Sequence, residues 1–315
     1  MAQHNISIND STASDDDLLM EFISKYYYAE RVFIWILSVV EIPVMILTLI
    51  GLCFIIKSRP AASVFVSNLI LSDLIQVICI LIAAANSLPY NLSRAYLYSL
   101  ITGLYFMACV AFERYLLVSH PIWYRSHQSL KLSCFISVIV WFVPLIFVLL
   151  SYFYLSIIPV CIVCLIPYPI IILCFAGTRR GLSRSISLTA LKRKLILGSL
   201  FLVLLTYTFL ILPFVIMLFI VYFDRYYSVV VMKFHSYTHL LVCVNPLADC
   251  VLYLFMRPDI RNMMKSVRCC CRRQRSNHNQ DEHSVVNPQN SCCTVVCCIS
   301  AQEPASHSLN TCSSV

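Results

Sequence analysis

The chain has 315 residues, of which 60% are hydrophobic and only 12% carry a charge, and its mean hydropathy is +0.81. Soluble domains hold about 25% charged residues, so this composition predicts a membrane protein. The formal net charge of +8 does not indicate nucleic-acid binding, because the basic residues fall in short segments between apolar runs. Many of the 17 cysteines lie inside apolar runs, where cysteine acts as a small hydrophobic residue, so a secreted disulfide scaffold is excluded.

The first 30 residues are polar and acidic, and they contain two N-glycosylation sequons, at Asn5 and Asn9. Two sequons in a short acidic segment predict that residues 1–30 form a glycosylated extracellular segment. The segment lacks a short apolar core followed by a cleavage site, so we expect no signal peptide. The first transmembrane helix would then direct insertion into the membrane.

Residues 31–256 contain the long apolar stretches, and a helix that crosses a bilayer needs about 20 such residues. We predict seven transmembrane helices, over residues 32–56, 62–86, 95–118, 132–155, 157–177, 195–223 and 229–255. Lysine and arginine concentrate after the first, third, fifth and seventh stretches. The positive-inside rule therefore places the N-terminus outside the cell and the C-terminus in the cytoplasm. A six-helix chain would place the arginine-rich C-terminal region outside, so we reject it.

Residues 257–271 alternate apolar and basic residues at helical spacing, which predicts a short amphipathic helix on the inner leaflet. Cysteines beside arginines near a membrane are candidates for palmitoylation, and three such residues end this segment: Cys269, Cys270 and Cys271. The alternatives are a tail of free thiols or a metal site, and no CxxC spacing with histidines supports the metal site. Residues 272–315 are rich in Ser, Asn, Gln and His and predict a disordered cytoplasmic tail.

The third apolar stretch ends with a carboxylate and a guanidinium, Glu113 and Arg114, followed by His120 and Pro121. Both charges are costly in hydrocarbon, so they should lie at the membrane edge and pair with each other. Such a pair would act as a latch that opens when the helices move apart. The alternative is an interfacial anchor, in which Arg114 extends to the lipid headgroups.

Two further carboxylates lie in mid-membrane, Asp73 in the second stretch and Asp249 in the seventh. A membrane aspartate must pair, bind a cation or be protonated. If the two face each other, they should share a proton or a sodium ion, with Asn245 beside them. The alternative for Asp73 is a structural aspartate held by hydrogen bonds. In the sixth stretch, Pro213 removes a backbone hydrogen bond and predicts a bend.

Taken in order, these residues resemble the rhodopsin-like (class A) G-protein-coupled receptors over roughly residues 32–270. The resemblance rests on Asn68 with Asp73, Glu113-Arg114-Tyr115, Trp141, Pro167, Pro213, and Asp249 with Tyr253. Within this class, three stretches resemble the branch that includes proton-sensing, purinergic nucleotide and lysolipid receptors. They are Glu113 through Tyr124, Ser58-Arg59-Pro60, and Asn245 through Tyr253.

The resemblance implies an all-α plasma-membrane protein, a seven-transmembrane helix bundle with a short amphipathic eighth helix. It implies coupling of an extracellular signal to a heterotrimeric G protein, with arrestin, receptor kinases and membrane lipids as further partners. It implies no enzymatic activity and no nucleic-acid partner. The residues that would carry G-protein coupling and the activation switch are Glu113, Arg114, Tyr115, Phe175 and Tyr253. A polar core able to hold sodium would comprise Asp73, Asn245 and Asp249.

The chain also departs from the pattern of this class. The first-helix asparagine of the class is Met45 here, the proline after the seventh-helix aspartate is Cys250, and the sixth-helix aromatic residue is Ile211. Phe175 replaces a fifth-helix tyrosine. The connection between the fourth and fifth stretches is very short, and the outer disulfide of the class has no matching cysteines. These departures put conventional ligand binding in doubt.

For the ligand, the branch favours protons, or a small anionic lipid or nucleotide. His235 and His239 lie four residues apart at the outer start of the seventh stretch and could titrate near physiological pH. Their alternative role is that of ordinary interfacial histidines. A nucleotide would need a cluster of outward cations, and Arg94, Arg225 and Lys233 are few.

Two other classes of function stay open. A transporter would show internal repeats and midplane sites between broken helices, and we find no repeat. A non-signalling receptor-like protein, or a truncated splice form with impaired ligand binding, is the stronger alternative because of the departures described above. An enzyme is not expected, because no nucleophile–base constellation or metal-ligand spacing is present.

Overall fold

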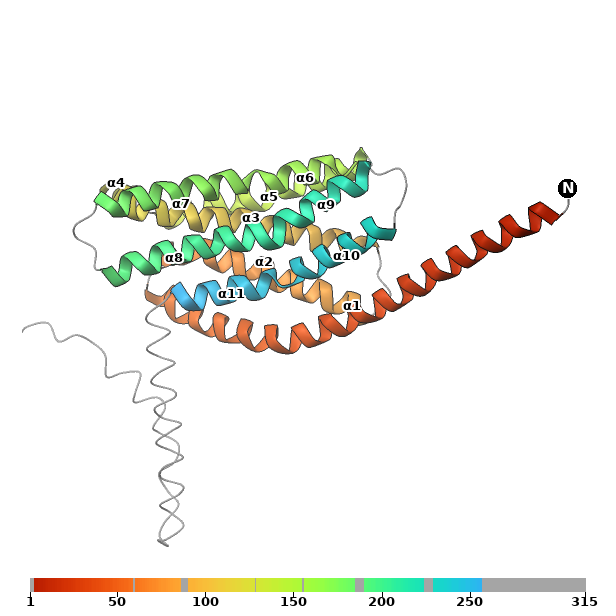
Figure 1. Cartoon of the computed structure of the whole chain (residues 1–315). Coiled ribbons are helices and arrows are strands. Elements are labelled where there is room, and N and C mark those ends of the chain that lie inside the picture. The colour runs from red at the N-terminus through yellow and green to blue at the C-terminus, as the bar shows by residue number, and fades with distance from the viewer. Residues whose placement is uncertain are drawn as a thin grey trace, which may run out of the picture. The chain divides into compact units, whose positions relative to one another are not determined.

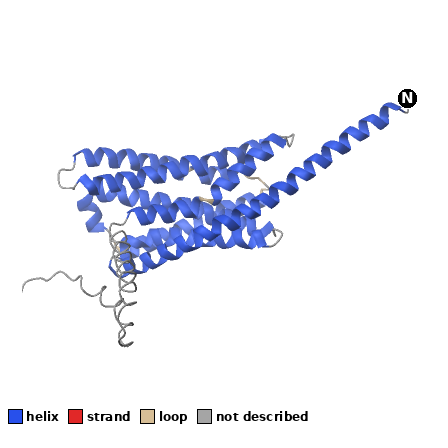
Figure 2. Cartoon of the chain, turned by 60° about the horizontal axis from the view of Figure 1, so that its bottom comes forward, coloured by secondary structure: helices blue, strands red, loops and turns tan. Residues whose placement is uncertain are grey.

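A computed structural model of the chain describes residues 3–58, 60–85, 90–127, 129–154, 156–184, 190–223 and 229–256. All regular elements in these ranges are helices (Figure 2). They are α1 (Gln3–Ser58), α2 (Pro60–Ala85), α3 (Tyr90–Ser119), α4 (Pro121–His127), α5 (Leu130–Phe153), α6 (Ile158–Leu165), α7 (Pro167–Arg184), α8 (Ala190–Thr206), η1 (Tyr207–Ile211), α9 (Leu212–Phe223), α10 (Val229–Cys243) and α11 (Asn245–Met256).

Seven helical spans in the described ranges are long and apolar enough to cross a membrane. They are Ser24–Cys53, Ser63–Ala85, Arg94–Ser119, Leu130–Phe153, Ile158–Leu182, Arg193–Phe223 and Lys233–Leu254. Each overlaps one of the seven predicted stretches, so the prediction of an all-α bundle of seven transmembrane helices is confirmed.

The third span, α3, lies at the centre of the bundle and packs against α2, α5, α7 and α8 (Figure 1). In the most apolar part of the α3 span, 67% of the residues are buried inside the bundle. In the corresponding part of the α5 span, 28% are buried. The exposed side chains of α5 are large and apolar, as Phe135 and Phe142 show. An apolar outer face of this size marks a surface that contacts lipid.

Three spans are interrupted close to a proline. The fifth consists of α6 and α7, which meet just before Pro167, and the sixth changes to the π-helical turn η1 just before Pro213. The seventh breaks at Val244, whose N–H donates to the Leu241 carbonyl at 3.1 Å, two residues before Pro246. A proline cannot donate to the helical ladder, so the backbone shifts at these points.

The connection between the fourth and fifth spans is short, because α5 ends at Phe153 and α6 begins at Ile158. Every cysteine whose side chain the structure describes is free, and Cys161 and Cys164 are buried in α6. Asn5 and Asn9 fall where the structure describes the backbone of α1 alone. The predicted amphipathic helix over 257–271, with Cys269, Cys270 and Cys271, and the tail over 272–315 lie outside the described residues.

Candidate functional site

The carboxylate at the end of α3 is held by a tyrosine from the next helix. Glu113 is 7% exposed, and the Tyr124 hydroxyl donates a hydrogen bond of 2.5 Å to its Oε1. α4 begins at Pro121, one residue after the break at His120, and its Tyr124 reaches the side chain of Glu113 on α3. Burial, followed by the contact with Glu113, raises the pKa of Tyr124, so the hydroxyl keeps its proton as a donor at physiological pH.

Two residues after Glu113 on α3, Tyr115 packs closely against a glycine of α7. A Cβ atom added at Gly177 would lie 2.5 Å from Cε2 of the Tyr115 ring. One turn further along α7, a Cβ atom at Gly181 would lie 2.7 Å from the Ser119 hydroxyl oxygen. The two glycines, four residues apart, therefore let the backbones of α3 and α7 approach as small residues do between membrane helices.

The remaining predicted coupling residues lie on three different spans. Arg114 on α3 is partly buried, and Tyr253 on α11 is buried. Phe175 on α7 is partly buried and its ring lies 6.1 Å from that of Phe201 on α8. We call this region the Glu113 end of the bundle. Sequence analysis included Tyr124 in the stretch that follows Glu113 but gave it no role, and it did not find Gly177 or Gly181.

The three predicted residues of the polar core are all buried within the bundle. Asp73 is 0%, Asn245 0% and Asp249 1% exposed. Gln76 donates to Asp73 Oδ1 at 3.2 Å, and Asn245 donates to Asp249 Oδ2 at 3.4 Å. Gly103 on α3 faces Asp73, because a Cβ atom there would lie 3.7 Å from Asp73 Oδ1.

Oxygen atoms in this core are available to a cation. Asp73 Oδ2, Asn245 Oδ1 and Asp249 Oδ1 have no hydrogen-bond partner among the described residues. Such oxygens suit a sodium ion, although no group of three or more His, Cys, Asp or Glu side chains in the described part of the chain is arranged to hold a metal. A sodium ion would therefore depend on Asp73, Asp249 and Asn245 together.

A further carboxylate, which sequence analysis missed, faces the same region. Glu41 on α1 is 3% exposed, and α1 packs against α2 and α11, the helices that carry Asp73 and Asp249. The signal was present in the sequence, since an acidic residue in an apolar run is a functional candidate by default. Sequence analysis did not use Glu41, because the residue of the first helix that the class pattern specifies is at Met45, one turn later.

The two predicted histidines lie together at the other end of the bundle, which we call the His239 end. His239 Nδ1 lies 3.1 Å from Glu30 Oε1 on α1. The Tyr96 ring of α3 meets the His239 ring edge-on at 6.0 Å between centroids. Phe214 of α9 stacks on His235 at 5.9 Å. Four spans therefore meet here, and nothing in the sequence spacing indicated Glu30.

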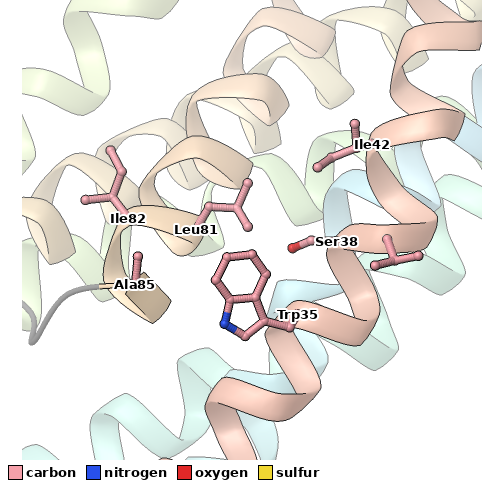
Figure 3. A pocket seen from close by; sticks show the side chains of 7 residues that line it. Trp35, Ser38, Ile42, Leu81, Ile82 and Ala85 are labelled. Atoms are coloured by element: carbon pink, nitrogen blue, oxygen red, sulfur yellow. The ribbon is translucent and has the colours of Figure 1, made fainter.

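A groove of about 390 Å³ opens between α1 and α2 near this end (Figure 3). Its wall is almost entirely apolar, and the labelled lining residues are Trp35, Ser38, Ile42, Leu81, Ile82 and Ala85. The Ser38 hydroxyl donates to the Ile34 carbonyl of its own helix and is not available to a ligand. Since Trp35 and Ile42 are also exposed on the outside of the bundle, the groove suits hydrocarbon and not a polar extracellular ligand.

Comparison with known proteins agrees with the sequence motifs. Residues 44–157 match the family model described as 7 transmembrane receptor (rhodopsin family). The chain is 31% identical over 102 residues to the proto-oncogene Mas of Rattus norvegicus, which covers 29% of this chain and 31% of that protein. It is 32% identical over 114 residues to free fatty acid receptor 3 of Homo sapiens, covering 32% and 33%.

The chain therefore spans about a third of the length of the curated relatives that it matches. The matched family consists of receptors, in agreement with the expectation that the chain is not an enzyme. The resemblance to a rhodopsin-like receptor is supported, while the narrower resemblance to the proton-sensing, purinergic and lysolipid branch stays a prediction.

Proposed function

We propose that this multi-pass membrane protein is a rhodopsin-like receptor, as its partial match to that family supports, and that it transmits an extracellular signal to a heterotrimeric G protein. The observation that carries the proposal is the arrangement at the Glu113 end. There the most buried span carries Glu113, Arg114 and Tyr115 in its last two turns. The Tyr124 hydroxyl donates to Glu113, and the Tyr115 ring packs on Gly177. The orientation proposed from the basic residues places this end in the cytoplasm.

In the resting receptor, the hydrogen bond from Tyr124 fixes Glu113 beside Arg114. Activation moves the inner end of the sixth span outward, and the Arg114 guanidinium then meets the G protein. Tyr253 moves inward to support it, whereas Phe175 has no hydroxyl to contribute. Arrestin and receptor kinases would bind the same face, and palmitoylated Cys269–Cys271 would hold the following segment at the lipid. A signal can drive this change only by favouring one arrangement over the other.

The buried core of Asp73, Asn245 and Asp249 would connect the two ends of the bundle. A sodium ion bound there would supply positive charge to two carboxylates, and its loss would allow them to take up a proton instead. The oxygen atoms without hydrogen-bond partners support this role.

For the signal itself we favour protons. A protonated His239 beside Glu30 would form an ion pair between the seventh span and α1. Acidification would strengthen this contact, so we expect signalling to rise as the extracellular pH falls. Glycans on Asn5 and Asn9 would lie on the same side of the membrane.

A small carboxylate is the second candidate signal. Free fatty acid receptor 3 is among the matched relatives, and its name describes an anionic lipid ligand. In this chain, the Arg94 guanidinium lies 4.4 Å from the centre of the Tyr152 ring at the start of the third span. A carboxylate ligand could bind such a cation. A nucleotide would need a cluster of cations for its phosphates, and a single guanidinium such as that of Arg94 does not provide one.

The first experiment is G-protein activation in cells that express the tagged chain at the plasma membrane, measured at extracellular pH 8, 7 and 6. Surface staining on the same cells gives the receptor density. Activation that rises with acidity supports a proton receptor, and activation only with added fatty acids supports the second candidate. Silence at full surface density contradicts the proposal and favours a non-signalling receptor-like protein. Solute or ion flux would favour a transporter.

A further inference from the structure

The groove between α1 and α2 has no part in the coupling described above (Figure 3). Val39 and Ile42 of α1 and Ile82 of α2 line it, and all three are exposed on the outside of the bundle. Both helices belong to membrane spans, so the chains of the bilayer lipids contact this surface. Such a contact exchanges one hydrocarbon neighbour for another, so the apolar wall alone does not distinguish between lipids.

One end of the groove lies at the boundary of the membrane. Trp35 lines this end on α1, and Ala85 lines it on α2 as the last residue of the second span. The first span is longer than the bilayer requires, because its 30 residues from Ser24 to Cys53 extend about 45 Å and the hydrocarbon core is about 30 Å thick. Tryptophan is enriched at the level of the lipid headgroups. The Trp35 end of the groove therefore lies where headgroups begin.

A cation lies one turn beyond this end, on the same face of α1. Arg31 precedes Trp35 by four residues and Ser38 by seven, and this spacing places the three residues on one side of the helix. Helical side chains lean toward the N-terminus, so the Arg31 guanidinium extends away from the groove toward the headgroups. Arg31 is exposed, and it forms no ion pair with any residue that the structure describes.

The carboxylates closest to Arg31 in the sequence have other partners. Glu30 lies about 100° further around α1, and its Oε1 is 3.1 Å from His239 Nδ1. Glu21 Oε1 lies 2.6 Å from the ammonium group of Lys25. The outer end of the groove therefore combines an apolar surface with a positive charge that is available to a negatively charged headgroup.

We propose that the groove and Arg31 together bind a phospholipid of net negative charge. One acyl chain lies in the groove against Ile42 and Ile82, and the phosphate pairs with the Arg31 guanidinium, which suits phosphate oxygens in a bidentate geometry. The Trp35 indole lies between the chain and the headgroup. A choline headgroup carries its own cation, which Arg31 repels, so a zwitterionic lipid binds less well. This site does not depend on the proposed signalling function.

Lipids with brominated acyl chains test the site, because bromine quenches the fluorescence of an indole that it contacts. The full-length protein is placed in phosphatidylcholine bilayers that contain a low mole fraction of brominated phosphatidylglycerol or, at the same fraction, brominated phosphatidylcholine. The Trp35 signal is the difference between the unmodified chain and Trp35→Phe, since Trp123 and Trp141 are present in both. Arg31→Gln removes the cation. Lys25→Gln is the matched control, because it removes a cation of the same helix that Glu21 already pairs with.

We expect brominated phosphatidylglycerol to quench Trp35 with an apparent affinity about fivefold higher than that of brominated phosphatidylcholine, the preference that one basic residue provides near an anionic headgroup. Arg31→Gln should remove this preference, and Lys25→Gln should keep it. Ala85→Leu fills the groove from an exposed position and should lower quenching by both lipids. Thermal unfolding of each variant confirms that it is folded.

Equal quenching of Trp35 by the two lipids in the unmodified chain would overturn the proposal, and so would a preference that survives Arg31→Gln. A brominated sterol that quenches Trp35 more strongly than phosphatidylglycerol would overturn it in favour of a sterol site. If no brominated lipid quenches Trp35, protein covers the groove, as in contact with a second copy of the chain, and the proposal is wrong.

Discussion

At the Glu113 end of the bundle, the central hydrogen bond joins residues only 11 positions apart, Glu113 and Tyr124. At the His239 end, Tyr26 on α1 donates to the Ser236 carbonyl at 3.5 Å across 210 positions, and Glu30 meets His239 from the same two helices. The hydrogen bond that holds Glu113 therefore comes from one span and the helix that follows it, and only the packing of Tyr115 on Gly177 brings in another span. The second exists only after the first and last spans have packed together.

This difference matters for signalling because α3 carries residues of both ends. Tyr96 touches His239 near the start of α3, and Glu113 lies 17 residues later. At 1.5 Å per residue this separation is about 26 Å. A change at the assembled His239 end must therefore act through packed spans to reach the locally built Glu113 end. Variants at each end test whether a change at the His239 end alters the Glu113 end through the packed spans.

The largest effect is expected for Arg114→Ala at the Glu113 end. The guanidinium is the proposed contact with the G protein, so activation at equal surface density should fall by roughly tenfold or more, equivalent to about 1.4 kcal/mol. Arg180→Ala is the control, because Arg180 is an exposed cation of α7. Equal activation in both variants would remove Arg114 from the coupling mechanism.

Gly177→Ala should have the next largest effect, on stability. The added methyl group would overlap the Tyr115 ring, and forcing α3 and α7 apart should lower the free energy of unfolding by about 1–3 kcal/mol. Gly198→Ala on α8 is the matched control, since no atom lies within 4 Å of its added Cβ. Thermal unfolding of the purified proteins checks both, and a stable Gly177→Ala variant would contradict the close approach of the two helices.

The same contrast explains what could be predicted from the sequence. The seven spans were predicted because apolar length alone specifies a membrane helix. Asp73, Asn245 and Asp249 were predicted to lie together because their motifs place them in mid-membrane, and they are buried there. Glu30 was not found, because its partner His239 lies at the far end of the chain. Gly177 was not found either, because the sequence does not show that the Tyr115 ring packs against this position and leaves no room for a side chain.

A smaller loss of stability is expected for Tyr124→Phe. The change removes the donor to Glu113 Oε1 and leaves the ring in place, so the free energy of unfolding should fall by about 1–2 kcal/mol. Basal G-protein activation should rise, because the bond fixes Glu113 in the resting arrangement. Tyr154→Phe, at a residue that is 74% exposed, should change neither quantity. If the two variants behave alike, the hydrogen bond does not contribute to the resting state.

The smallest effect is expected at the His239 end, and it depends on pH. His239 Nδ1 lies 3.1 Å from Glu30 Oε1, and the two side chains form an ion pair only when the imidazole carries a proton. The other titratable groups that face the pair are Tyr26, Tyr96, His235 and Cys243.

For a partly exposed pair the stabilisation is about 0.5–1 kcal/mol. The melting temperature of the unmodified chain should therefore fall slightly more between pH 6 and pH 8 than that of His239→Gln. His127→Gln, at an exposed histidine on α4, should keep the full pH dependence. G-protein activation should likewise depend on pH in the unmodified chain and in His127→Gln, and depend on it less in His239→Gln. The reason is that acidification changes the Glu113 end only through the contact between α10 and α1. A His239→Gln variant with an unchanged pH response would separate the two ends and leave a carboxylate ligand as the better candidate signal.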